Sequence, residues 1–155
     1  MAEDSTEQVT HFHQYFAIQT FNATWELIER PDRSADDDAE MLQRAFASRW
    51  HWGFVGGAEQ TATGDWQIAH VSSLLGYGWM AQFYAARAFA TCENEGWTDW
   101  RRASMLEGMA RAAAAAGDAD GRARYYAMAQ EAIAAIAEDD DRELIASQLA
   151  TVPEV

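Results

Sequence analysis

Apolar residues recur every three or four positions along most of the chain, which is the spacing that places them on one face of an α-helix. The clearest stripe near the start contains Tyr15, Ile18, Phe21, Trp25 and Ile28. No segment shows the alternation of polar and β-branched apolar residues that a half-buried strand needs. The pattern therefore predicts an all-α protein.

Helix boundaries follow from the residues that stop a helix. Proline disfavours helical backbone at the residue before it, and glycine readily takes the left-handed conformation that ends a helix. Breakers of these two kinds occur at Pro31, Gly56, Gly76, Gly96 and Gly117. The expected helices cover residues 6–30, 34–55, 64–75, 79–95, 98–116, 120–137 and 144–150, with a polar hinge over 58–64. Short connections favour antiparallel neighbours in a single domain over residues 1–155.

Two segments centred on a glycine look alike. One reads LLGYGWMAQFYAARAFA from Leu74, and the other reads AAGDADGRARYYAMAQEA from Ala115. In each, a glycine ends one helix and small residues open the packing face of the next. These glycines, Gly76 and Gly117, are 41 residues apart. The spacing indicates an internal repeat of one helical hairpin.

The small residues Ala81, Ala85 and Ala88 have the spacing found in the second helix of a tetratricopeptide repeat. Over residues 65–137 the chain thus resembles a degenerate tetratricopeptide-like array of helical hairpins, similar to short, uncharacterised bacterial proteins of that type. The resemblance implies six to seven helices stacked in antiparallel pairs. The alternative architecture is an up-down bundle of alanine-rich helices of similar length.

The charge balance limits the partners. The chain has 11 basic against 25 acidic residues, a net charge of −14, which repels nucleic acid and anionic lipid surfaces. We therefore expect neither a nucleic-acid nor a membrane partner. The single cysteine, Cys92, permits no internal disulfide and is expected to be buried on the alanine face. We see no secretory signal and no stretch of about 18 apolar residues, so we expect a cytoplasmic protein.

Counting back from each turn places four polar residues at a similar height on successive helices: His51, Asp65, Arg87 and Glu107. Polar side chains that meet across facing helices are how helical bundles build internal sites. The candidate ligand-binding residues are this layer together with its neighbours, namely His51, Asp65, Trp66, His70, Tyr84, Arg87 and Glu107.

The layer has two interpretations. As a site, His51 acts as an acid or base, Asp65 orients it, and Arg87 holds an anionic ligand group. As architecture, Arg87, Glu107 and Arg111 form an ion-pair network, in which Glu107 and Arg111 have the i,i+4 spacing of a helical pair.

The remaining histidines and tryptophans add little chemistry. His11 and His13 point to nearly opposite sides of a helix, and no spacing typical of metal ligands occurs, so we expect neither a metal nor a cofactor. Most tryptophans are expected to fill the core. Trp50 and Trp52 lie about 200° apart around the helix axis, so one of them is expected to be exposed.

We therefore expect a binding or scaffolding module with a polar, aromatic-lined pocket or groove for a peptide or small molecule. The alternative is a small helical enzyme that uses His51 with Asp65 or Glu107 in acid–base chemistry. A third option is a structural homodimer formed through exposed aromatic residues such as Trp50. No nucleophile motif is present, and no catalytic residue is assigned.

Overall fold

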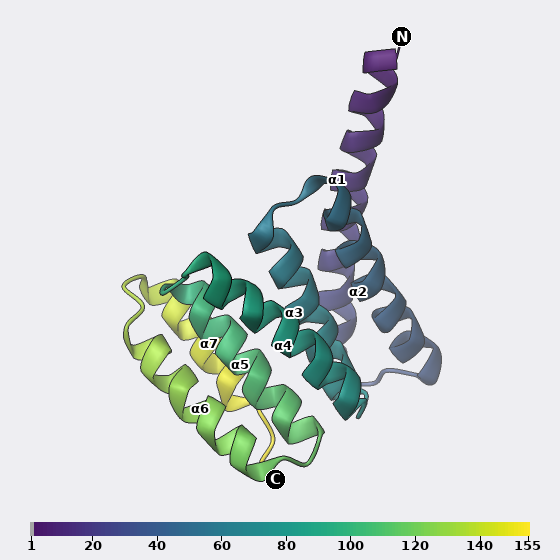
Figure 1. Cartoon of the computed structure of the whole chain (residues 1–155). Helices are drawn as coiled ribbons and strands as arrows, with labels where there is room; N and C mark the ends of the chain where they lie inside the picture. Colours follow the sequence, from purple (N-terminus) through teal and green to yellow (C-terminus); the bar gives the residue numbers. More distant parts are fainter. Residues whose placement is uncertain (1) are drawn as a thin grey trace.

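The structure, a computed structural model, describes residues 2–155, with side chains from Thr6 onward. Over these residues it contains seven α-helices and no strand, which confirms the all-α prediction. The helices are α1 (Ala2–Ile28), α2 (Ala35–Val55), α3 (Ala58–Leu74), α4 (Gly78–Glu95), α5 (Trp100–Ala115), α6 (Ala119–Ala134) and α7 (Asp139–Ala150). Each helix packs against the next, so the chain forms a row of helical hairpins (Figure 1). No helix within the described residues has the length and apolar content needed to cross a membrane.

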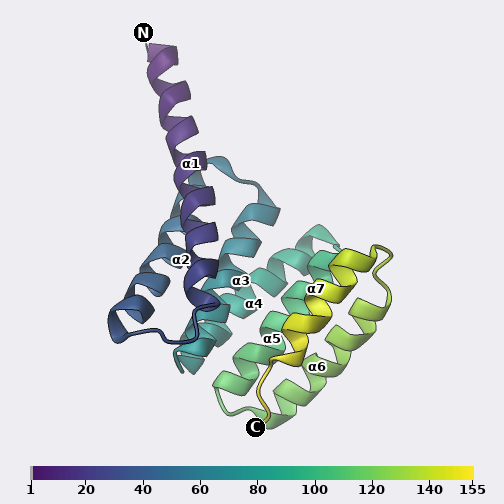
Figure 2. The same cartoon turned by 180° about the vertical axis from the view of Figure 1, so that it is seen from behind.

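The helices form two layers. The odd-numbered helices make an inner layer, in which α3 packs against α5 and α5 packs against α7. Figure 2 shows α1 and α7 on either side of α3 and α5. Because α3 and α5 are covered by neighbours on several sides, residues 64–72 and nearly all of 103–113 are buried. These two helices therefore form the centre of the molecule.

Two turns have the same geometry, 41 residues apart. Gly76 and Gly117 have φ of 76° and 74°, the left-handed conformation that favours glycine. After each glycine, the next backbone N–H donates to the carbonyl oxygen five residues earlier, at 2.8 Å for Tyr77 and 2.9 Å for Asp118. The α3–α4 and α5–α6 hairpins therefore repeat one turn. That this repeat belongs to the tetratricopeptide class stays a prediction.

The same spacing relates one position on each inner helix. Trp25, Trp66, Glu107 and Gln148 follow one another at intervals of 41 residues and lie on α1, α3, α5 and α7. The rings of Trp25 and Trp66 are 5.7 Å apart, and the Trp66 indole N–H donates to Glu107. We call these four residues the inner series.

Helix α3 differs from the prediction, because it begins at Ala58 and the expected polar hinge over 58–64 is helical. The Gly57 N–H donates to the Gln60 side-chain oxygen at 2.9 Å. The Thr61 N–H and hydroxyl both donate to the Gly57 carbonyl, at 3.1 and 3.0 Å. These bonds satisfy the first turn, so polar residues there extend the helix instead of breaking it.

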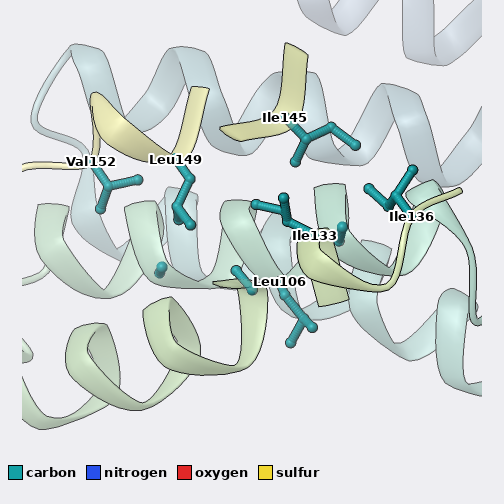
Figure 3. Close-up of a cluster of buried hydrophobic side chains, with 9 residues drawn as sticks. Leu106, Ile133, Ile136, Ile145, Leu149 and Val152 are labelled. Atoms are coloured by element: carbon teal, nitrogen blue, oxygen red, sulfur yellow. The ribbon is translucent and has the colours of Figure 1, made fainter. Parts of the chain in front are cut away.

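The C-terminal core fixes the position of α7. Apolar side chains from α5, α6, α7 and the residues just after α6 and α7 pack together, including Leu106, Ile133, Ile136, Ile145, Leu149 and Val152 (Figure 3). Each fully buried side chain of this size contributes about 1.5–3 kcal/mol relative to an exposed one. This packing holds α7 beside α5.

The alanine face of α4 is buried as predicted. Ala81, Ala85, Ala88 and Cys92 are at most 1% exposed and pack among side chains of α3 and α5. The thiol of Cys92 is therefore shielded from solvent, and burial raises its pKa.

Candidate ligand-binding site

The inner helices enclose a pocket of about 440 Å³, within the range of small-molecule sites. Its lining comes from all four of them and from the residue after α1: Phe21, Trp25, Glu29, Thr63, Trp66, Trp100, Ser104, Met105, Asp141, Leu144, Ile145 and Gln148. A second pocket of about 230 Å³ shares Phe21, Thr63 and Trp100 with the first. The two together form a groove along the inner layer.

Aromatic rings and carboxylates dominate the larger pocket. Trp25, Trp66 and Trp100 supply three indole rings, whereas no lysine, arginine or histidine lines the cavity. Glu29 and Asp141 lie at its edge, and neither carboxylate forms an ion pair or side-chain hydrogen bond with any residue that the structure describes. The pocket is therefore aromatic and anionic, with two charges open to a ligand.

A buried ion pair supports the wall of this pocket. Glu107 is fully buried and accepts hydrogen bonds from the Trp66 Nε1 at 3.1 Å and the Arg111 Nε at 2.7 Å. A terminal nitrogen of Arg111 also donates to the Gln148 carbonyl at 2.8 Å and to the Thr151 hydroxyl at 2.7 Å. The carboxylate thus orients the indole, and the guanidinium ties α5 to α7. Neither Glu107 nor Arg111 lines the pocket, but the two side chains hold Trp66 and α7, which do.

His70 lies behind the same wall. Its ring packs edge-on against Trp25 and Trp66, with centroids 5.3 and 5.6 Å away. Burial, with a smaller repulsion from Arg111, lowers the pKa of His70 to about 3, so the ring is neutral at pH 7. Its Nδ1 atom has no hydrogen-bond partner among the described residues. His70 therefore packs as an uncharged ring against both indoles.

Asp65 belongs to a separate group of charges. Its two carboxylate oxygens accept from the Nε atoms of Arg49, at 2.8 Å, and Arg87, at 3.2 Å. The half-exposed Arg87 guanidinium also lies 5.8 Å from the Tyr84 ring centroid. Asp65 and Arg87, which were expected at a similar height, are therefore in contact. The prediction that Glu107 shares this group is wrong, because Glu107 is bound by Trp66 and Arg111.

His51 lies on the opposite side of α2 from this group. Its Nδ1 shares a 2.9 Å hydrogen bond with the Nδ1 of His13, so the prediction that Asp65 orients His51 is wrong. Positions 49 and 51 point about 200° apart on a helix, and Arg49 occupies the direction toward Asp65. The acid–base arrangement expected around His51 is therefore not formed.

The seven predicted residues thus fall into three places. Trp66 lines the pocket, with His70 and Glu107 directly behind it. Asp65 contacts Arg87 of α4, whose guanidinium also lies over the Tyr84 ring, and His51 pairs with His13 of α1. For these last four, a role in ligand binding stays a prediction.

Sequence reasoning missed most of the pocket lining, including Trp25, Glu29, Trp100 and Asp141. One signal was present in the chain. The 41-residue interval of Gly76 and Gly117, applied backward from Trp66, leads to Trp25. Among the side chains that the structure describes, from Thr6 onward, no three His, Cys, Asp or Glu residues come close enough together to hold a metal ion.

Gly108 permits the close approach of Trp66. A larger residue at position 108 therefore tests how Trp66 is packed in the pocket wall. A Cβ atom at Gly108 would lie 2.7 Å from the Trp66 Cδ1 and 3.1 Å from its Nε1. We expect Gly108→Ala to displace the indole from Glu107 and to lower the free energy of unfolding by about 1–3 kcal/mol. Urea denaturation at constant protein concentration measures this change.

Gly53→Ala is the matched control, because Gly53 is also helical and its nearest neighbour would be the Arg49 side chain at 3.6 Å. We expect this variant to be more stable by about 0.5–1 kcal/mol, since alanine favours helix over glycine. A Gly108→Ala protein as stable as Gly53→Ala would contradict the packing of Trp66 described above.

No protein-family model matches this sequence, and no curated protein or solved structure matches it either. The pocket and the contacts that shape it are therefore the basis for a functional conclusion.

Proposed function

We propose that this protein is a binding module whose inner pocket takes an organic cation, carried by a small molecule or by a peptide side chain. The observation that carries the proposal is the meeting of three indole rings with two unpaired carboxylates, Glu29 and Asp141, in one cavity. An indole face attracts a cation through its quadrupole by about 0.5–2 kcal/mol, and most strongly when the cation loses water. A carboxylate at the rim adds Coulombic attraction.

The charge of the whole chain favours the same class of ligand. A net charge of −14 raises the concentration of cations near the surface and speeds their association. The inner wall is also held rigid, because Trp66 is bound to Glu107 and α7 is tied to Arg111. A preformed pocket loses little conformational freedom when a ligand enters, which favours binding as the role of this site.

Binding can be measured by titration calorimetry with choline and with its uncharged isostere 3,3-dimethylbutanol. We expect choline to bind at least tenfold more tightly, which corresponds to about 1.4 kcal/mol. A peptide containing trimethyllysine, titrated in parallel, distinguishes a peptide-borne cation from a free one. Equal affinity for choline and dimethylbutanol, or no binding of any cation, would rule out this function.

Variants locate the site. We expect Asp141→Asn to weaken cation binding about tenfold. The neighbouring Asp140→Asn is a matched control, since Asp140 is exposed and does not line the pocket. Trp100→Ala and Trp79→Ala form a second pair, because Trp79 is 72% exposed on α4, far from the lining. Equal effects within either pair would place binding elsewhere on the molecule.

A further inference from the structure

The first half of α1 carries an exposed aromatic surface outside the pocket. In both views this part of the helix extends beyond the rest of the molecule (Figures 1 and 2). Five of the exposed apolar side chains on α1 and α2, each 45–67% exposed, form what we call the hairpin patch: Val9, Phe12, Phe16, Trp50 and Phe54. A protruding helix of a few turns is marginally stable in water without tertiary contacts. The structure thus leaves both an apolar surface and a helix end to be covered.

Ring contacts hold the hairpin patch in a defined shape. Phe54 packs against Trp50 with centroids 5.5 Å apart, and His13 stacks on Phe54 at 4.2 Å. Phe16 contacts the ring of His51, which is itself hydrogen-bonded to His13. The rings linked by these contacts are therefore connected across α1 and α2, and their side chains have little freedom left to lose on association.

The distribution of charge favours a second copy of this chain over a cationic partner. No Asp, Glu, Lys or Arg occurs between Glu7 and Glu26, although the chain carries 25 acidic residues. On the facing part of α2, the charge of Arg49 is balanced by Asp65. A cationic partner would find no carboxylate in the patch, whereas a second copy meets no repulsion there. Contacts between other parts of two copies would be opposed by repulsion, because each copy carries a net charge of −14.

We propose that two copies of this chain associate through the hairpin patch, with α1 and α2 of each packed against α1 and α2 of the other. A two-fold axis makes the contact self-complementary, so aromatic residues of one copy cover those of its partner. The contact covers the exposed turns of α1. It leaves the pocket between α1, α3, α5 and α7 open, so the proposal is independent of the cation site.

Light scattering coupled to size-exclusion chromatography tests the proposal on the full chain. We expect the wild type to have twice the monomer mass of 17.3 kDa and to dissociate on dilution. Phe12→Asp and Phe54→Asp place a carboxylate in the patch and are expected to restore the monomer mass. Phe83→Asp is the matched control, because Phe83 on α4 is 52% exposed and outside the patch, and it should stay dimeric.

Amide hydrogen exchange gives a second measurement that needs no variant. We expect exchange in residues 6–16 to slow as the wild-type concentration rises, while exchange in α6 stays unchanged. A wild type that is monomeric at every concentration overturns the proposal. So does a dimer that survives both patch variants, or a hairpin patch protected only when phosphatidylcholine vesicles are added, which would assign it to a lipid surface.

Discussion

Arg111→Ala is expected to lower the free energy of unfolding by about 3–5 kcal/mol, because it leaves the carboxylate of Glu107 buried without its charged partner. Glu107 is fully buried and Arg111 is 3% exposed, so water cannot replace the guanidinium without opening the core. The Trp66 N–H would remain as the single side-chain donor to that carboxylate. The variant also removes the bonds from α5 to the Gln148 carbonyl and the Thr151 hydroxyl.

Two controls separate the buried charge from other losses. Arg122→Ala removes an arginine that also reaches C-terminal carbonyls, those of Val152 and Pro153, but that touches no buried carboxylate. We expect it to change stability by about 1 kcal/mol or less. The double variant Glu107→Gln with Arg111→Met removes both charges and should be more stable than Arg111→Ala alone. Urea denaturation checks all three, and equal stability of Arg111→Ala and Arg122→Ala would refute the argument.

The fold was largely predictable because its turns depend on local chemistry. Gly76, Gly96 and Gly117 each end a helix with positive φ, and a glycine in that role is visible in the sequence. The start of α3 was not predictable in the same way. Residues 58–64 look like a loop, but the Gln60 side chain caps the helix through the Gly57 N–H. Capping by one side chain decided the structure of a segment whose composition suggested the opposite.

The candidate site was less predictable. The position of a side chain along its helix axis can be counted from the sequence, whereas the direction in which it points relative to the neighbouring helices cannot. Asp65 and Arg87 were placed at the same height and do meet. His51 was placed at that height as well, but it points toward α1. The i,i+4 pair of Glu107 and Arg111 was predicted, since both residues lie on one helix and need no information about neighbours. Contacts between helices need the relative rotation of each pair, which the sequence pattern leaves open.

The tryptophans illustrate the same difficulty. One of Trp50 and Trp52 was expected to be exposed, and Trp50 is 67% exposed. The broader expectation that most tryptophans fill the core holds only in part. Trp66 is buried, whereas Trp25, Trp97 and Trp100 are half-buried and pack against core side chains. Trp25 and Trp100 also line the pocket, where a large ring stays in contact with solvent. The pocket joins residues from Phe21 to Gln148, and no local pattern connects positions so far apart.

Acidification from pH 7 to pH 4.5 is expected to lower the free energy of unfolding by about 2.5 kcal/mol through His70 alone. Burial lowers the pKa of His70 from 6.5 in the unfolded chain to about 3 in the folded protein. Below pH 6.5 the unfolded state therefore binds a proton and the folded state does not. The contribution is fully present above pH 6.5 and is lost as the pH falls toward 3, at up to about 1.4 kcal/mol per pH unit.

The pH window excludes the contribution of the shifted carboxyls. Hydrogen bonds with Ser34 and Arg101, respectively, lower the pKa of the carboxyls of Asp37 and Asp99 from 3.8, so their contribution is lost below the window. His51, whose pKa is lowered by burial and by the neighbouring His13, adds a slope of the same sign to the wild type and to both variants below. His70→Leu replaces the ring with an uncharged side chain between Trp25 and Trp66. We expect urea denaturation of this variant, at fixed protein concentration, to show a shallower dependence on pH than the wild type. His11→Leu, at an exposed position on α1, is the matched control and should keep the wild-type slope. A wild-type slope in the His70→Leu protein would mean that His70 is not held neutral behind the pocket wall.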